Sequence, residues 1–294
     1  MIYRIRHITE YDYHSPVSLC INQAHVLPRN TTEQRCRHSD IRITPRPEYL
    51  AEREDYFGNR YCYFAVEREH QKLVIDVTTE IETSAQNANR NLDLGNTCAQ
   101  AKKLLADARS AECIAAREFI LDSPMVQACD ALREFTRGIF NEDRPLLSAV
   151  RELCHKIHHE FTYEPLSTNT TTSLEEVLQN RRGVCQDFAH LAIGCIRAQG
   201  FPARYVSGYL ETLPPPGKEK LIGADASHAW LAIYSPGEGW FDFDPTNNNM
   251  PDEQHITTAW GRDYGDVTPV KGVIFADDAS QELKVSVNVE RLTG

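Results

Sequence analysis

The stretch RRGVCQDFAH, residues 181–190, places a cysteine between a turn glycine and the start of an apolar run. From Phe188 onward, apolar residues recur at intervals of three and four, and this spacing predicts the buried face of a helix. The members of this face are Phe188, Leu191, Ala192, Cys195 and Ile196. We expect the helix to end at Gln199, because Gly200 suits the left-handed position after a helix and Pro202 cannot prolong it.

Cys185 therefore lies at or just before the N-terminus of this helix. Unpaired backbone N–H groups and the positive end of the helix dipole favour a negative charge there, so a thiolate nucleophile is expected. The alternative is a buried cysteine without a chemical role, and this stretch alone gives the two interpretations about equal weight.

A second stretch, HAWLAIY at 228–234, is followed by SPGEG and then by WFDFDP at 240–245. Two β-rich runs around a Pro/Gly turn predict a β-hairpin. Alternation places Ala229, Leu231 and Ile233 on one face of the first strand. Phe241 and Phe243 lie on the matching face of the second strand, so these two faces should pair in the core.

This pairing leaves His228 and Asp244 together on the opposite face of the hairpin. Folding the hairpin about residue 236 also places them directly across from each other, with Cβ atoms about 4.5–5.5 Å apart. At that distance a carboxylate can accept a hydrogen bond from an imidazole, which is the base-orienting half of a catalytic triad. The alternative is that Asp244, which precedes a proline, only starts a turn by accepting backbone N–H bonds.

The motifs GVCQDFAH, HAW and WFDFDPTN, in this order, resemble the core of the transglutaminase-like superfamily of cysteine enzymes in its bacterial branch. The segments FTY at 161–163 and RDYGDVTPVKG at 262–272 resemble the same branch, so the resemblance covers most of residues 145–290. It implies an α+β fold with a papain-like core, in which a helix carrying the cysteine packs on an antiparallel sheet. It also implies that Cys185 is the nucleophile, His228 the general base and Asp244 the residue that orients the imidazole.

Further residues are expected around this triad. The backbone N–H of Cys185 at the helix start is a natural oxyanion donor. Gln186 and Tyr163 are candidates for the second donor, the tyrosine because the family often has an aromatic residue there. Trp230 is a candidate wall of the cleft, although sheet packing would explain it too.

Composition limits the classes of partner and compartment. The chain has 294 residues, of which 41% are hydrophobic and 25% charged, and its formal net charge of −11 opposes binding to nucleic acid. No apolar run of 18 residues occurs and the N-terminus is charged, so neither a membrane span nor a secretory signal is expected. Nine cysteines without a C-x-x-C pair indicate a reducing compartment, with the cytoplasm as the default.

The chain divides into four expected parts. Residues 1–84 alternate five β-rich runs (3–13, 22–28, 36–44, 61–66 and 73–81) with turns such as Gly58-Asn59, which predicts an antiparallel β-sandwich-like domain. We interpret it as a scaffold in preference to a substrate-recognition wall. Residues 85–144 form a helical or irregular connection, and residues 145–272 form the core. Residues 273–294 contain a strand, with Leu283, Val285, Val287 and Val289 in alternation, that returns to the β-domain.

Helices are predicted at 124–137, opened by Pro124, at 145–160, and at 174–181, where Ser173-Leu174-Glu175-Glu176 is a capping-box pattern. The last of these should stop at Gly183. His155, His158 and His159 share one side of the second helix, but no further metal motif accompanies them, so no metal and no cofactor are expected. The long segment 211–227 precedes His228 and is either a rim of the cleft or an ordinary loop.

These residues support acyl transfer through a thioester on Cys185, most simply as a peptidase or amidase acting on a peptide or protein. Transamidation of protein glutamine is the second hypothesis. A non-catalytic binding module on the same fold is the third, and it is disfavoured because no triad member is missing.

Overall fold

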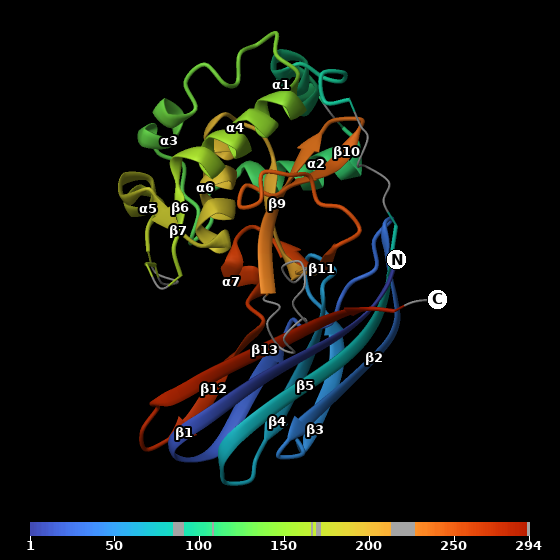
Figure 1. Ribbon diagram of the computed structural model, residues 1–294, viewed down its shortest axis with the longest axis vertical. Coiled ribbons are helices and arrows are strands. Elements are labelled where there is room, and N and C mark those ends of the chain that lie inside the picture. Colours follow the sequence, from blue (N-terminus) through green and yellow to red (C-terminus); the bar gives the residue numbers. More distant parts are fainter. Residues whose placement is uncertain (85–90, 108, 166, 169–171, 213–226, 293–294) are drawn as a thin grey trace, which may run out of the picture.

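The computed structural model describes residues 1–84, 91–107, 109–165, 167–168, 172–212 and 227–292. Two lobes are visible in Figure 1: a β-domain built from both ends of the chain, and a core lobe of helices and a smaller sheet built from residues 91–267. Most of the segment 211–227, for which a rim of the cleft was one expectation, lies outside the described residues. Among the described residues, no helix is long and apolar enough to span a membrane.

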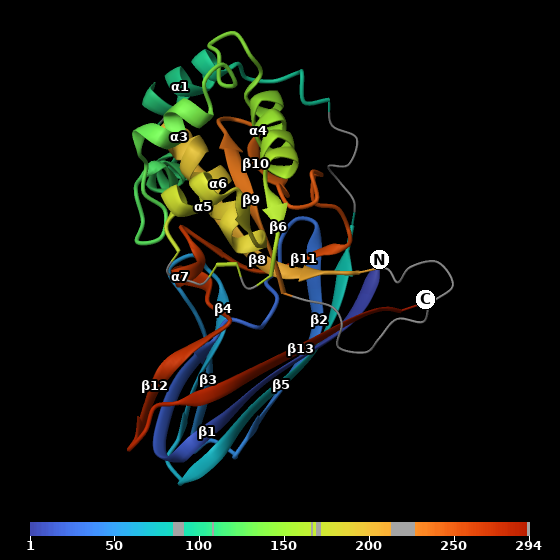
Figure 2. The same cartoon turned by 60° about the vertical axis from the view of Figure 1, so that its left-hand side comes forward.

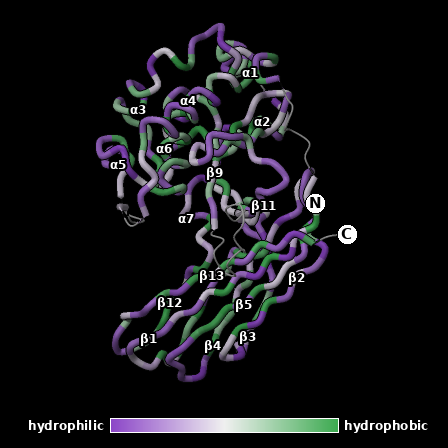
Figure 3. The backbone as a smooth tube through the Cα atoms, viewed as in Figure 1, coloured by the Kyte–Doolittle hydropathy of each residue, from purple (hydrophilic) through white to green (hydrophobic). Residues whose placement is uncertain are grey.

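The β-domain is organised around β1, Ile2–Ala24, a single strand where the sequence predicted two separate runs. A register irregularity between Asp12 and Val17 marks the break between those runs. The first half of β1 pairs with β5 (His70–Thr83) and the second half pairs with β4 (Arg60–Val66), both antiparallel. Their apolar faces enclose one core, and hydrophobic and hydrophilic residues alternate along these strands (Figure 3).

Two further strands flank this sheet at its edges. β2 (Gln34–Thr44) pairs with β5, and β3 (Tyr49–Glu54) pairs with β4. The sequence did not predict β3, because its side chains are exposed or half-buried and carry no apolar alternation. The predicted turn at Gly58 joins β3 to β4, and this glycine has the positive φ of 72° that the turn requires.

The C-terminal strands β12 (Val270–Ala276) and β13 (Gln281–Arg291) both pair antiparallel with β1. The expected half-buried alternation holds only for the last part of β13. Val287 and Val289 are buried, whereas Leu283 and Val285 are more than half exposed. The difference arises because only the end of β13 lies under the core lobe, where its valines pack with Tyr209 and Ile256 of that lobe.

The core lobe contains a four-stranded antiparallel sheet in the order β10–β9–β8–β11. Its strands are β8 (Ala203–Leu210), β9 (Ser227–Ser235), β10 (Gly239–Phe243) and β11 (His255–Gly261). The long helix α6, Cys185–Ala198, lies against one face of this sheet (Figure 2) and is buried over most of its length. Leu231 and Ile233 on β9 share one core with α6, as the alternation predicted.

Shorter elements surround α6. The helices are α1 (Cys98–Asp107), α2 (Ala111–Arg117), η1 (Glu118–Ile120), α3 (Asp130–Phe135), α4 (Leu146–Glu160), α5 (Leu174–Asn180) and α7 (Tyr264–Val267). Two short strands, β6 (Thr162–Tyr163) and β7 (Arg182–Gly183), pair in parallel just before α6. The boundaries of α4 and the capping box of α5 between Ser173 and Glu176 agree with the sequence prediction.

The predicted helix at 124–137 is wrong in its first half. Ser123 and Val126 instead close a tight turn, and the Met125 N–H donates to the buried Asp263 carboxylate at 2.9 Å. This bond to a distant carboxylate fixes the turn at Met125, and the helix α3 begins only at Asp130. At the end of α6, Gly200 takes the left-handed conformation as predicted, with φ 85°.

We predict that Leu73→Ala lowers the free energy of unfolding by about 2–5 kcal/mol, because Leu73 is fully buried in the β-domain core. Leu283→Ala in the same domain should change it by less than about 0.5 kcal/mol, because this leucine is 55% exposed. Urea unfolding of both variants measures the difference. An equal loss of unfolding free energy in the two variants would show that the start of β13 is buried in solution.

Candidate active site

The hairpin of β9 and β10 has the predicted faces but a different register. Phe243 pairs with Leu231 and Phe241 with Ile233, so the apolar faces match. The turn is centred on Gly237 and not on residue 236, because three residues lie between the paired Ser235 and Gly239. The sequence predicted that Asp244 lies directly across from His228. In the structure it is displaced from that position by two residues. A shift of two preserves the face, so the two side chains still meet diagonally.

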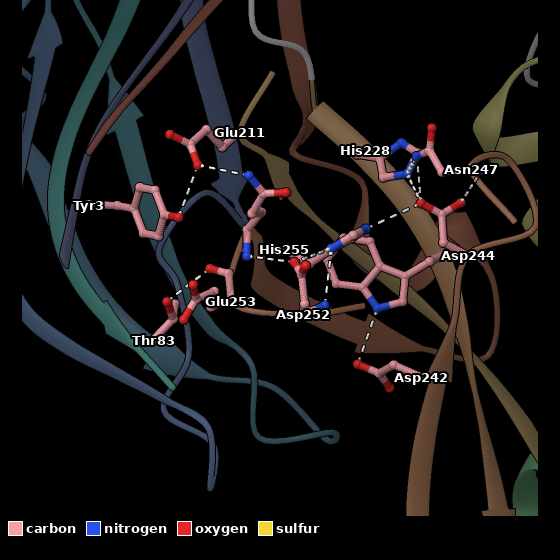
Figure 4. A network of polar contacts seen from close by, with 12 residues as sticks. Tyr3, Thr83, Glu211, His228, Asp242, Asp244, Asn247, Asp252, Glu253 and His255 are labelled. Carbon is pink, nitrogen blue, oxygen red and sulfur yellow. Dashed lines mark hydrogen bonds and ion pairs between the residues drawn. The ribbon is translucent and has the colours of Figure 1, made fainter. Parts of the chain in front are cut away.

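His228 and Asp244 form a short hydrogen bond in this arrangement (Figure 4). The Nε2–H of His228 donates to Oδ2 of Asp244 at 2.7 Å, and the aspartate side chain is fully buried. This bond leaves Nδ1 as the ring nitrogen that can face the thiol of Cys185. Burial alone would lower the pKa of the His228 imidazole, but hydrogen bonds to Asp244 and to Cys185 raise it to about 10, from an ordinary value of 6.5. An imidazolium is therefore favoured near neutral pH.

Asp244 also starts the turn that follows β10. The carboxylate therefore both accepts from His228 and begins a turn, the two roles that the sequence analysis set against each other. Its Oδ1 accepts the backbone N–H groups of Thr246 and Asn247 at 2.9 and 3.1 Å. Its Oδ2 accepts the side-chain amide of Asn247 at 2.7 Å besides the imidazole. Burial would raise the pKa of the Asp244 carboxyl, but hydrogen bonds from His228, from the histidine at position 255 and from the Asn247 amide hold it well below its usual range.

Cys185 is the first residue of α6, and its side chain is half-buried. The turn before it is fixed by Asp187, whose Oδ2 accepts the Val184 N–H at 2.8 Å and the Thr168 hydroxyl at 2.6 Å. Gly183 makes this bond possible, because a Cβ atom there would lie 2.8 Å from the same carboxylate oxygen.

Gly183 therefore does not end the helix α5, as the sequence predicted. Arg181 takes the left-handed C-cap position with φ 54°, and Gly183 lies in the strand β7. The glycine is required by the close approach of the Asp187 side chain and not by a helix terminus.

The three residues proposed around the triad lie in different surroundings. Tyr163 pairs with Gly183 through β6 and β7 and is half exposed. Burial raises the pKa of its hydroxyl, and the proximity of Cys185 adds to this effect. Gln186 lines a pocket of about 550 Å³ together with His190. Trp230 is completely buried on the same face of the sheet as His228, with the two ring centroids 6.0 Å apart, and its indole N–H donates to Asp242 at 3.2 Å.

The histidines of α4 contact the turn that carries Asp244. His158 Nδ1 lies 2.8 Å from the carbonyl oxygen of Thr246, and the side chain of Asn248 donates to His155 Nδ1 at 3.1 Å. His159 Nδ1 donates to the carbonyl oxygen of His155 at 2.9 Å. These side chains thus bond separately to backbone and amide groups, and the first two help to hold the turn after Asp244.

Two family models match parts of this chain. Residues 3–82 match the family model of the bacterial transglutaminase-like N-terminal region, and residues 133–245 match that of the transglutaminase-like superfamily. A Mycobacterium tuberculosis protein described as uncharacterized is 38% identical over 298 residues, with 99% of this chain and 93% of that protein covered.

The chain belongs to the transglutaminase-like superfamily. Cys185, His228 and Asp244 all lie within the part that matches the superfamily core. The fold is also that of a proposed cysteine protease from Cytophaga hutchinsonii, with a TM-score of 0.74 at 23% identity, covering 100% of this chain and 92% of that one. A protein-glutamine gamma-glutamyltransferase of Pseudomonas aeruginosa is 32% identical over 139 residues, which cover 45% of this chain and 20% of that enzyme.

One residue of this transglutaminase-like site was missed by the sequence interpretation. His255, the first residue of β11, directs Nε2 at the same Asp244 oxygen that His228 uses, at 3.2 Å. Among the described residues, His228, Asp244 and His255 form the group of three potential metal ligands, with the ligand atoms within 4.8 Å of one another. Here both imidazoles bond to the carboxylate, so the group is a hydrogen-bonded network. No sequence pattern identified His255, because β11 meets Asp244 only through the tertiary fold.

We predict that iodoacetamide alkylates Cys185 faster than any other cysteine near neutral pH, because Cys185 is the half-buried first residue of α6 and lies beside the His228 imidazolium. Cys36 and Cys129, which are also half-buried, are the internal controls. His228→Gln should slow labelling of Cys185 about tenfold or more and leave the controls unchanged. Peptide mapping over a time course gives the rates, and equal labelling of Cys36 or Cys129 would argue against the assignment.

Proposed function

We propose that this chain is a cysteine hydrolase, a peptidase or amidase that transfers an acyl group through a thioester on Cys185. The observation that carries the proposal is the 2.7 Å bond between His228 and the buried Asp244, with Cys185 close enough to raise the pKa of the same imidazole. This arrangement combines a nucleophile, a base and an orienting carboxylate in one chain of contacts.

In the proposed reaction, the Cys185 thiolate attacks a peptide or carboxamide carbonyl and forms a tetrahedral intermediate. The Cys185 backbone N–H has no acceptor within the helix, because it belongs to the first turn, and it is available to the oxyanion. The imidazolium of His228 then gives its proton to the leaving amine as the C–N bond breaks. Water, deprotonated by the neutral imidazole, cleaves the thioester and restores the thiol and the product acid.

Transamidation is the alternative in which an amine replaces water in the last step. It is favoured by the partial similarity to the Pseudomonas aeruginosa protein-glutamine gamma-glutamyltransferase. Hydrolysis needs no second substrate, and we therefore place it first. A non-catalytic binding module is the least favoured candidate, because it would not explain a thiol at a helix start beside an imidazole that is held by a buried carboxylate.

The proposal extends to partners and compartment. We propose a peptide or protein substrate, and not nucleic acid or membrane, on the basis of the net charge of −11 and the peptide-type chemistry of the site. All nine cysteines are free thiols, which favours a reducing compartment such as the cytoplasm.

A peptide library analysed by mass spectrometry tests the proposed reaction. In the presence of EDTA, we expect cleaved or deamidated peptides whose carbonyl carbon carries oxygen from water, and added primary amine should leave this outcome unchanged. Cys185→Ala should abolish all products while the Tm stays nearly constant, because the half-buried thiol contributes little to the core. Amine-capped products would support transamidation instead, and turnover by Cys185→Ala would overturn the proposal.

We predict that Asp244→Asn lowers kcat by about three orders of magnitude, because an amide cannot both accept the turn N–H groups and accept from His228. Asp242→Asn, two residues earlier on β10, is the matched control, since Asp242 bonds to Trp230 and not to His228. It should reduce kcat less than about tenfold. Steady-state kinetics of both variants, with Tm as a check on folding, distinguish the two roles, and equal losses would contradict a specific role of Asp244.

A further inference from the structure

We infer that His255 is a positioning residue for His228, acting through the Asp244 carboxylate that the two imidazoles share. This inference rests on the proposed function in one respect, that the Cys185–His228 pair performs the chemistry. The contact of His255 with the site is its bond to Asp244, so its effect on reactivity would pass through that carboxylate.

The geometry of the shared carboxylate is the first argument. Oδ2 of Asp244 accepts from His228 at 2.7 Å and from His255 at 3.2 Å, and the two ring nitrogens approach it from different directions (Figure 4). The second donor to this oxygen opposes rotation of the carboxylate away from His228. It also favours the ionised carboxylate, since the hydrogen bond from His255 contributes to the lowered pKa of the Asp244 carboxyl.

His255 is itself held in place on several sides. Its side chain is 3% exposed, and its ring packs edge-on against Trp230 with the ring centroids 5.3 Å apart. On the other ring edge, Nδ1 lies 3.5 Å from Oδ1 of Asp252 and 3.4 Å from its backbone N–H. A single rotamer is thereby selected, with Nε2 directed at Asp244.

The β-domain supports the segment that carries His255. The Thr83 hydroxyl of β5 donates to the carbonyl oxygen of Glu253 at 2.8 Å. Gln254 donates to Glu211 at 3.2 Å, and Glu211 in turn accepts the Tyr3 hydroxyl of β1 at 3.0 Å. Figure 4 shows that these bonds lead from β1 and β5 to the segment before β11. The β-domain thus stabilises the position of His255, in addition to covering the core lobe.

The charged groups around His255 determine the direction in which its pKa is shifted. Asp244 and Asp252 raise the pKa of His255 against the effect of burial, whereas the His228 imidazolium lowers it. Asp242, on the strand β10 at the other edge of the sheet, also lies within electrostatic range of His255. Both the neutral and the charged imidazole can donate from Nε2, so the positioning bond persists in either state.

His255 also forms part of the wall of a pocket of about 500 Å³ between the two lobes, together with Arg204, Trp240 and Trp260. Removal of the ring would extend this pocket to the Asp244 carboxylate. A free imidazole molecule is small enough to enter a space of this size, and it carries the same N–H donor. The pocket therefore permits a chemical-rescue experiment at this position.

The experiment measures the alkylation rate of Cys185 by iodoacetamide as a function of pH in the full chain, so that no substrate needs to be known. His255→Ala should slow labelling near pH 6 about tenfold, the effect of one hydrogen bond to a charged group, and shift the pH profile upward. His255→Gln should restore most of the rate, because its side-chain amide can place a donor close to the position of Nε2. Added imidazole should accelerate His255→Ala several-fold and leave the unmodified chain unchanged.

His7→Ala is the matched control for loss of a buried, hydrogen-bonded histidine near the lobe interface. His7 is 3% exposed and bonds to Tyr209 at 2.7 Å, but it has no contact with Asp244. It should lower the Tm about as much as His255→Ala without changing the pH profile of labelling. The inference is overturned if His255→Ala folds and labels at the unmodified rate, or if glutamine and imidazole both fail to restore the rate.

The two hypotheses fail in different ways in this assay. If His228→Gln leaves the labelling of Cys185 unchanged, the proposed acyl-transfer site itself is wrong. If His228→Gln slows labelling but His255→Ala does not, the site stands and only the positioning role of His255 is rejected.

Discussion

The buried carboxylate of Asp244 is the constraint on which the rest of the site depends. A charge without solvent is stable in a protein only where hydrogen bonds replace water. Five donors do so here: the backbone N–H groups of Thr246 and Asn247, the Asn247 amide, and the imidazoles of His228 and His255. Removal of any donor leaves a buried charge less satisfied, so the surrounding elements are held to one arrangement.

These five donors come from three parts of the fold: the turn after β10, the strand β9 and the strand β11. The turn after β10 supplies two backbone donors, and the histidines of α4 hold that turn from outside. The strand β9 supplies His228, while β11, two strands away across β8, supplies His255. The carboxylate therefore connects the hairpin, the sheet and the helix α4, and the imidazole that faces Cys185 is fixed by all of them.

The interface between the lobes extends this arrangement. Valines at the end of β13 and Tyr3 on β1 pack with Tyr209 and Ile256 of the core sheet. Beside this apolar contact, Arg204 lies between the rings of Trp240 and Trp260, with its guanidinium carbon 4.2 and 3.6 Å from the ring centroids. The β-domain thus packs against two strands of the sheet that carries His228. This agrees with its interpretation as a scaffold and gives the scaffold a defined point of contact with the site.

The sequence by itself determined the elements whose signals are local. The spacing after Cys185 predicted α6, Ser173 and Glu176 predicted a capped α5, and alternation predicted which faces of β9 and β10 are buried. These predictions were correct because helix and strand periodicity reflect burial along one segment. The contact between His228 and Asp244 followed from the same alternation, and it survived an error of two positions in the register because side chains repeat every second residue.

Only the tertiary structure decided the features that depend on distant partners. Asp263 replaced the first half of a predicted helix with a turn, and Asp187 explains why residue 183 is glycine. The exposure of Leu283 depends on where the core lobe ends, which no alternation within β13 reveals. His255 is the strongest example, because nothing near it in the sequence indicates a site. It meets Asp244 only when β11 joins the sheet, and a hydrogen bond across the fold leaves no periodic signal in either segment.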